Sequence, residues 1–185
     1  MLQAMAKVPR HHFAPSRIRG DAYVDASLPL GPGATIPPPY VIASTLAALE
    51  LRGFERVLDV GAGSGYQTAL LCELVSHVCA VEIVRERAQY ADGRLSRLGY
   101  RNYTMMVGNG REGLPLEGPF DRIVVAAAAE EIPRGLVDQL EPGGRMLIPV
   151  GGPDGQVLER VTKRSDGTFT VEQLDRCACV PLLQV

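Results

Sequence analysis

The residues best suited to chemistry form one glycine-rich segment, Asp59-Val60-Gly61-Ala62-Gly63-Ser64-Gly65-Tyr66. The segment follows a short apolar run and opens a helical pattern. Glycines here let the backbone turn tightly and approach a ligand that a Cβ atom would exclude. The helix start adds free N–H groups. The spacing is GxGxG and not the GxGxxG of dinucleotide sites, so a pyrophosphate fits less well.

An acidic residue, Glu82, closes the next apolar run about twenty residues beyond the first glycine, where a carboxylate can accept from both ribose hydroxyls. Asp59, at the end of the first run, is placed to steer a cationic amino group. The alternative explanation for the glycines alone is a tight strand-to-helix connection that binds no ligand. The combination of strand, glycine turn, helix and terminal acid favours a nucleoside, in particular an adenosyl group with a charged amino-acid tail.

The elements that must position these residues alternate between strand and helix. Strand-like runs occupy 56–60, 78–82, 103–107, 122–127 and 145–150. Helical patterns occupy 38–51, 64–75, 84–98 and 133–140, with Ser64 as a candidate N-cap for the second. This alternation predicts an α/β fold, a mostly parallel sheet with helices on both faces.

The carboxyl-terminal part departs from that alternation. Residues 157–164 and 168–174 are strand-like and are joined by Ser165-Asp166-Gly167, which indicates an antiparallel hairpin. We expect a single domain over 1–185. It comprises an irregular amino-terminal arm with one short helix (1–36), a cofactor-binding core (37–151) and carboxyl-terminal strands (152–185).

Composition excludes several classes of function. The chain has 185 residues, 46% of them hydrophobic, and 19 basic against 21 acidic side chains for a net charge of −2. This balance provides no basic field for nucleic acid and no polybasic membrane anchor. No apolar run approaches the ~18 residues that span a bilayer, and the first residues do not resemble a signal peptide. We expect a cytoplasmic monomer that binds neither nucleic acid nor membranes.

The four cysteines, Cys72, Cys79, Cys177 and Cys179, lack CxxC spacing and lie in apolar runs. Reduced thiols are therefore expected rather than a disulfide framework. Cys177 and Cys179 would share one face of a strand, which by itself does not make a metal site, and we expect no metal.

Eight further segments match one known family. They are AMAKVPRHHFAP at 4–15, DAYVDASLPLGPGATI at 21–36, VLDVGAGSGYQTALL at 57–71, HVCAVEIV at 77–84, GNGREG at 108–113, PFDRIVVAAAAEEIP at 119–133, LEPGGRMLIPVG at 140–151 and VPLL at 180–183. The VPR-x-x-F-x-P opening, LPLG-x-G-x-TI and GSGYQTA are its more specific parts. Through them the sequence resembles the protein-L-isoaspartate O-methyltransferase family over nearly all its length. Many members of that family carry a further helix ahead of the AM-x-x-VPR segment, and this sequence begins without it.

The resemblance implies the S-adenosylmethionine methyltransferase sheet with a rearranged carboxyl-terminal strand order. It also implies methyl transfer from S-adenosylmethionine to the α-carboxylate of isoaspartyl residues in damaged proteins or peptides, the first step of their repair. The implied roles are as follows: Asp59, Gly61, Gly63 and Ser64 face the methionine portion; Glu82 binds the ribose; Asn109 and Gly110 border the adenine; Thr35, Ile36 and Pro37 close over cofactor and acceptor; Val180 belongs to the acceptor wall.

The sequence departs from the family pattern in three places. Pro37 stands where the family usually has Ser, so a hydroxyl and an amide hydrogen are absent; such a contact is worth about 1–3 kcal/mol. Asn109 replaces an aspartate but keeps a carbonyl oxygen. Cys177-Ala178-Cys179 replaces larger residues of the usual VRFVPL and reshapes the acceptor wall. The first and third changes fall on the same predicted site.

The methyl transfer that the resemblance implies needs no catalytic base. A carboxylate has a reference pKa near ~4, so the acceptor is already an anion at neutral pH, and transfer requires alignment and exclusion of water. His11, His12 and His77 are accordingly interpreted as structural or solvated side chains.

Isoaspartyl methylation leads the hypotheses. A diverged carboxyl methyltransferase for another peptide or small-molecule acceptor and a non-catalytic cofactor-binding homologue stay open. A nicotinamide dehydrogenase is disfavoured by the glycine spacing.

Overall fold

The amino-terminal arm is more ordered than the sequence predicts. The computed structural model describes residues 1–152 and 154–183. The arm contains α1 (Leu2–Lys7), two short 3₁₀ segments (Arg10–His12 and Ser16–Asp21), and a small antiparallel pair, β1 (Leu28–Gly31) with β2 (Ala34–Ile36). The prediction of an irregular arm with one short helix was therefore wrong at β1 and β2, which form a regular antiparallel pair. Gly31 and Gly33 have φ of 143° and 66° and supply the turn between two strands too short to show periodicity.

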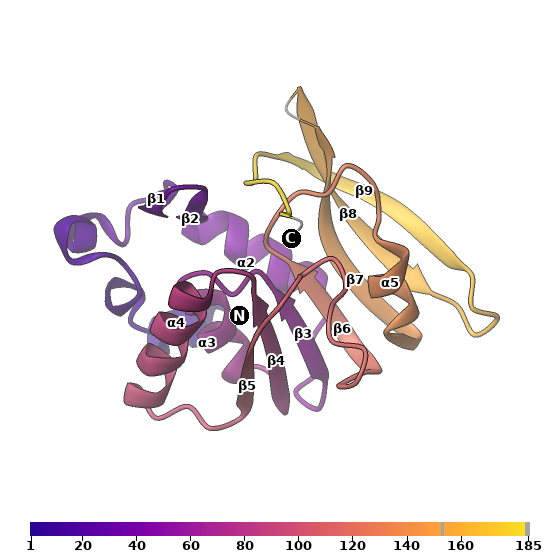
Figure 1. The fold of residues 1–185 in the computed structure, drawn as a ribbon, viewed down its shortest axis with the longest axis horizontal. Coiled ribbons are helices and arrows are strands. Elements are labelled where there is room, and N and C mark those ends of the chain that lie inside the picture. Colours follow the sequence, from indigo (N-terminus) through magenta and orange to yellow (C-terminus); the bar gives the residue numbers. More distant parts are fainter. Residues whose placement is uncertain (153, 184–185) are drawn as a thin grey trace.

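Within residues 1–152 and 154–183, seven strands form the main sheet, in the order β5-β4-β3-β6-β7-β8-β9 (Figure 1). Their bounds are β3 (Arg56–Val60), β4 (His77–Glu82), β5 (Tyr103–Val107), β6 (Phe120–Val125), β7 (Leu140–Gly152), β8 (Gly155–Lys163) and β9 (Phe169–Cys177). Strands from β5 to β7 run parallel, and β8 and β9 are antiparallel additions. The predicted mostly parallel sheet with an antiparallel carboxyl-terminal hairpin is confirmed.

The helices are α2 (Pro39–Ala48), α3 (Tyr66–Cys72), α4 (Arg85–Arg97) and α5 (Arg134–Asp138), each shorter than its predicted pattern. Side chains alternate along β3: Val57 joins a core with α2 and α3, whereas Leu58 joins a core with α5. Helices therefore cover both faces, as expected for an α/β sheet. Among the described residues, no helix combines the length and apolar character required to cross a membrane.

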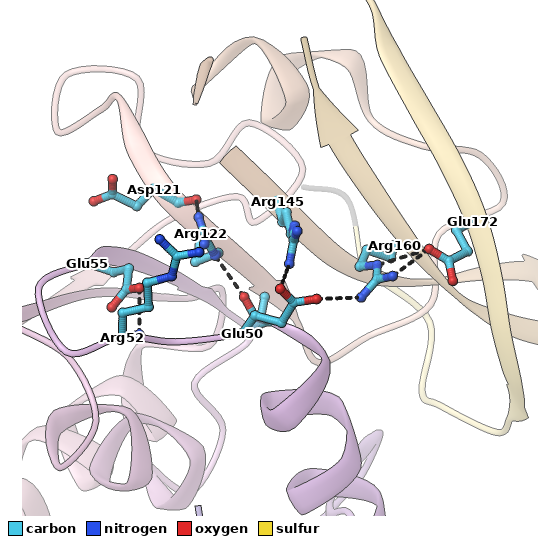
Figure 2. Close-up of polar contacts among 9 residues, drawn as sticks. Glu50, Arg52, Glu55, Asp121, Arg122, Arg145, Arg160 and Glu172 are labelled. Carbon is cyan, nitrogen blue, oxygen red and sulfur yellow. Dashed lines mark hydrogen bonds and ion pairs between the residues drawn. The ribbon is translucent and has the colours of Figure 1, made fainter. Parts of the chain in front are cut away.

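A cluster of charges fixes the carboxyl end of α2 against the sheet (Figure 2). Glu50, at a φ of 54°, makes ion pairs with Arg145 on β7 and Arg160 on β8, and Arg160 also pairs with Glu172 on β9. Arg122 on β6 donates to the Leu49 carbonyl at 2.8 Å. These contacts tie the end of α2 to β6, β7 and β8.

The tail after β9 returns to the carboxyl edge of the parallel strands (Figure 1). The Ala128 N–H donates to the Val180 carbonyl at 2.8 Å, and the Leu182 N–H donates to the Ala128 carbonyl at 2.7 Å. Residues 180–183 thus lie beside the segment that follows β6, at the edge where ligands of open α/β sheets bind.

Candidate cofactor and acceptor site

The glycine turn after β3 is fastened to the end of β4. The Gly61 and Ala62 N–H groups both donate to the Val81 carbonyl, at 2.8 and 3.2 Å. Gly61 and Gly63 have φ of 86° and 53°, in the left-handed region that glycine adopts without steric cost. The turn therefore brings bare backbone to the cleft in a shape that other residues adopt only with strain.

Glu82 links that turn to the segment after β4. Its Oε2 accepts from the Gly63 N–H at 2.9 Å, its Oε1 accepts from the Val84 N–H at 3.0 Å, and Arg87 lies 3.7 Å away. The side chain is 4% exposed and lines the cleft. An ionised carboxylate has about four lone-pair sites. Two are engaged by backbone, so Glu82 retains acceptors for a diol.

Helix α3 begins later than predicted. It starts at Tyr66, and Gly65, at a φ of 85°, occupies the N-cap position, so Ser64 is not the N-cap residue. Ser64 Oγ instead accepts from the Tyr66 N–H at 3.2 Å and still satisfies one free donor of the first turn. The left-handed turn explains the shift, since the chain becomes helical only after Gly65.

Asp59 lies beneath the cleft and not on its wall. It is fully buried, and its carboxylate accepts from Gln67 Nε2 at 2.8 Å and Thr68 Oγ1 at 2.7 Å. Gln67 lines the cleft. Burial raises the pKa of Asp59 to about 6, against the hydrogen bonds from Thr68 and Gln67, with nearby Glu82 adding to the rise. Asp59 therefore contacts the cleft only indirectly, through the Gln67 side chain that it holds.

The raised pKa of Asp59 gives a testable pH dependence. The folded state holds its proton up to about pH 6, whereas the unfolded chain releases it near 3.8. Stability is therefore lost as pH rises through this window, by roughly 3 kcal/mol at most. We expect the unfolding free energy of Asp59→Asn, relative to the natural chain, to rise between pH 4 and 6 and then level off.

Urea unfolding at half-unit pH steps measures this difference. The matched control is Asp154→Asn, at an exposed turn. A difference between Asp59→Asn and the natural chain that does not vary with pH would contradict the assignment.

The turn after β5 forms another side of the cleft. Gly110 lines it, whereas Asn109 does not: Asn109 Oδ1 accepts from the Arg111 N–H at 3.1 Å, and its Nδ2 donates to Glu112 at 3.0 Å. The Asn109 side chain thus shapes the turn from within. A Cβ atom on Gly110 would lie 2.6 Å from Val60 Cγ1, so only glycine fits between β3 and the cleft.

The opposite wall comes from β2 and the returning tail. Thr35, Ile36, Pro37 and Val180 all line the same cleft as the glycine turn, together with Ala126. Of the residues predicted for the site, Asp59 and Asn109 lie outside the lining of this cleft. The Cys177-Ala178-Cys179 segment, predicted for the acceptor wall, lines the adjoining cavity instead. The fold therefore brings together parts of the chain more than a hundred residues apart.

Sequence reasoning missed Arg10 as a residue that supports this wall. Arg10 is 1% exposed; its Nε donates to the Ala22 carbonyl at 2.6 Å and its Nη2 to the Pro37 carbonyl at 2.8 Å. Its guanidinium lies 4.9 Å from the centre of the Tyr66 ring. An arginine in the specific VPR opening was a signal available in the sequence. Gln67, which also lines the cleft, lies in the equally specific GSGYQTA segment and was missed in the same way. Arg87, a further residue of the lining, carried no comparable signal.

A second cavity, of 630 Å³, adjoins the cleft and shares Pro37, Ile42, Gln67 and Ala126 with it. One side is α2, and the other is the end of β9, with Cys177, and the residues just after it, with Cys179. Among the described residues, no group of three or more His, Cys, Asp or Glu side chains is placed to hold a metal ion.

Comparison with known proteins gives consistent matches. The family model described as Protein-L-isoaspartate(D-aspartate) O-methyltransferase matches residues 1–185. Proteins named protein-L-isoaspartate O-methyltransferase from Aeropyrum pernix and Dictyoglomus turgidum are 49% and 46% identical. The aligned parts cover 99% and 98% of this chain, and 72% and 82% of those relatives.

Two solved structures with the same protein name also align with this chain. One is described as a protein-L-isoaspartate O-methyltransferase from Plasmodium falciparum in complex with S-adenosyl-L-homocysteine. It aligns with a TM-score of 0.84 at 27% identity, over 98% of this chain and 88% of that one. Another structure named protein-L-isoaspartate O-methyltransferase, 24% identical, aligns over 97% of this chain and 59% of that one with a TM-score of 0.88, which shows the shared fold.

Proposed function

Since the chain belongs to the protein-L-isoaspartate O-methyltransferase family, we propose that the cleft between the glycine turn and β2 is where its residues hold donor and acceptor. The chain is an S-adenosylmethionine-dependent enzyme that methylates the carboxylate of L-isoaspartyl residues in damaged proteins and peptides. The observation that carries the site assignment is the direct bond between the Gly63 N–H and Glu82, which joins the turn and the acid.

The donor fits the residues present. Glu82 keeps free acceptor sites for the ribose diol, Gly61 and Gly63 leave space for the methionine portion, and Gly110, which packs directly against Val60, borders the place proposed for the base. When bound, S-adenosylmethionine supplies an electrophilic methyl group on a sulfonium. We propose that Asp59, with Gln67 and Ser64, orients the amino-acid end, and that Asn109 sets the shape of the adenine turn.

The acceptor side requires alignment and not proton removal. An isoaspartyl carboxylate is ionised at neutral pH, so the protein's task is to orient it and exclude water. We propose that Thr35, Ile36, Pro37 and Val180 perform this task, and that Arg10 positions Pro37 through its carbonyl. The small side chain of Ala126 leaves room between the turn and this wall.

A paired-peptide assay tests the function. Incubation with radiolabelled S-adenosylmethionine is expected to give a base-labile methyl ester on an isoaspartyl peptide and far less on the same peptide with ordinary aspartate. The variant Glu82→Ala sets the background. Equal labelling of both peptides would favour a diverged carboxyl methyltransferase. Calorimetric binding of S-adenosylmethionine without transfer to either peptide would favour a non-catalytic homologue.

We further propose that residues 1–185 act as one domain, as a monomer in the cytoplasm, on protein and peptide acceptors and not on nucleic acid or membranes. The net charge of −2 and the four free cysteines, all in the described part of the chain, support this setting. Sedimentation analysis at micromolar concentration tests the oligomeric state.

A further inference from the structure

Two thiols meet at the edge of the acceptor wall. Cys177 is the last residue of β9, Cys179 follows two residues later, and each thiol affects the pKa of the other. Both are partly exposed, and both line the 630 Å³ cavity next to the cleft. Small reagents can therefore reach both thiols from one cavity.

We propose that Cys177 and Cys179 are a modification site: a low-molecular-weight disulfide converts them to an intramolecular disulfide, and this oxidation weakens acceptor binding. The chemistry stands on the geometry of the pair alone. Its consequence for activity rests on the proposed function.

The conversion is two successive thiol–disulfide exchanges. The Cys177 thiolate attacks one sulfur of the reagent disulfide, and the other half leaves as a thiolate that takes up the proton Cys177 released. Cys179, on losing its proton, then attacks the Cys177 sulfur and releases the second half of the reagent as a thiol. The protein dithiol is oxidised, one reagent disulfide is reduced to two thiols, and no proton is gained or lost overall.

The bond requires a bend in the chain. Residues two apart in extended chain have Cα atoms about 6.6 Å apart, within the range of about 4.4–6.8 Å found in disulfides. Their Cβ atoms point to the same side and are about as far apart, whereas a disulfide needs about 3.5–4.5 Å. Bond formation therefore bends the chain at Ala178, just beyond the last residue of β9, and draws Cys179 toward Cys177.

The order of attack follows from the environment of each thiol. Burial raises the pKa of Cys177, but the hydrogen bond from Cys179 acts in the opposite direction. Burial raises the pKa of Cys179 to about 12. Cys177 is therefore the first nucleophile, and the pair stays reduced until a reagent disulfide is in excess.

The contraction acts on the acceptor wall. Gln156 holds Cys179 from both sides: its Oε1 accepts from the Cys179 N–H at 2.6 Å, and its Nε2 donates to the Cys179 carbonyl at 3.1 Å. The next residue is Val180, whose carbonyl accepts from the Ala128 N–H. Closing the disulfide pulls against the Gln156 contacts and shifts Val180, whereas Glu82 and the glycine turn lie on other strands.

The test uses the full chain treated with excess oxidised glutathione. Free thiols are then alkylated under denaturing conditions, and cleavage after Arg176 releases Cys177 and Cys179 in one peptide for mass spectrometry. We expect this peptide to have lost two hydrogen atoms and to resist alkylation. Cys72 and Cys79, which are buried, remain alkylatable and serve as internal controls.

Activity is compared before and after oxidation for each protein. We expect the KM for an isoaspartyl peptide to rise about tenfold on oxidation, with the KM for S-adenosylmethionine within about twofold, and dithiothreitol to reverse the change. Cys177→Ser and Cys179→Ser, each measured against its own untreated form, should show no such rise.

A 177–185 peptide that is alkylated at both cysteines, or that carries only glutathione adducts, would overturn the proposal. So would an equal rise in KM in Cys177→Ser and Cys179→Ser. If the untreated chain methylates no isoaspartyl peptide, the proposed function fails, and the peptide mass still decides whether the disulfide forms.

Discussion

Replacing Glu82 by alanine is expected to weaken S-adenosylmethionine binding about a hundredfold or more, the equivalent of roughly 2.7 kcal/mol. The change removes the proposed acceptor of the ribose hydroxyls. It also leaves the N–H groups of Gly63 and Val84 without their partner, at about 1–3 kcal/mol for each one that stays buried. Isothermal titration calorimetry with S-adenosylmethionine measures the loss directly.

Two companion variants separate binding from folding. Glu82→Gln keeps one carbonyl oxygen and should retain an intermediate affinity. Glu86→Ala removes an exposed carboxylate in the first turn of α4 and should bind like the natural chain. If Glu82→Ala unfolds cooperatively with the same midpoint temperature as the natural chain and still binds the donor normally, Glu82 does not hold the ribose.

Gly110→Ala is expected to lower donor affinity at least tenfold and the free energy of unfolding by about 1–3 kcal/mol. The new Cβ atom would lie 2.6 Å from Cγ1 of the fully buried Val60 and 3.4 Å from Leu182 Cδ1. The backbone at Gly110 must shift to relieve the contact with Val60, and that shift moves one side of the cleft. Calorimetry and urea unfolding report the two effects.

The double variant Val60→Ala with Gly110→Ala gives the sharper test, because shortening Val60 removes the atom that the new Cβ meets. Donor affinity should recover relative to Gly110→Ala alone. Gly93→Ala is the matched control: nothing lies within 4 Å of its added Cβ, and alanine in a helix interior should stabilise by about 0.5–1 kcal/mol. If the double variant loses donor affinity by the sum of the two single losses, the contact between the new Cβ atom and Val60 is not the cause of the Gly110→Ala effect.

The fold was largely predictable because its signals are local. The runs at 56–60 and 103–107 are strands with those bounds, and the hairpin at 165–167 joins β8 to β9. Helix ends were predicted less well. Helix α3 spans Tyr66–Cys72 and not 64–75, because the left-handed Gly65 delays its start and helical bonding ends near Glu73. The β1–β2 pair escaped prediction because its strands are too short for periodicity.

The site was predictable in its parts but not in its assembly. The GxGxG turn and Glu82 are visible in the sequence because backbone shape and strand ends impose local requirements. The placement of Asp59 beneath Gln67, and of Asn109 within its own turn, depends on which neighbour each polar atom meets.

Three features could be predicted from local sequence: the alternation of strands and helices, the turn where only glycine fits, and the acid that closes β4. Each depends on residues within a few positions of one another. The tertiary structure alone decided that Arg10 reaches Pro37, that Val180 returns to Ala128, and that the Cys177–Cys179 pair borders the acceptor cavity. Those contacts join distant parts of the chain, and burial and hydrogen-bond satisfaction select them only once the whole sheet has formed.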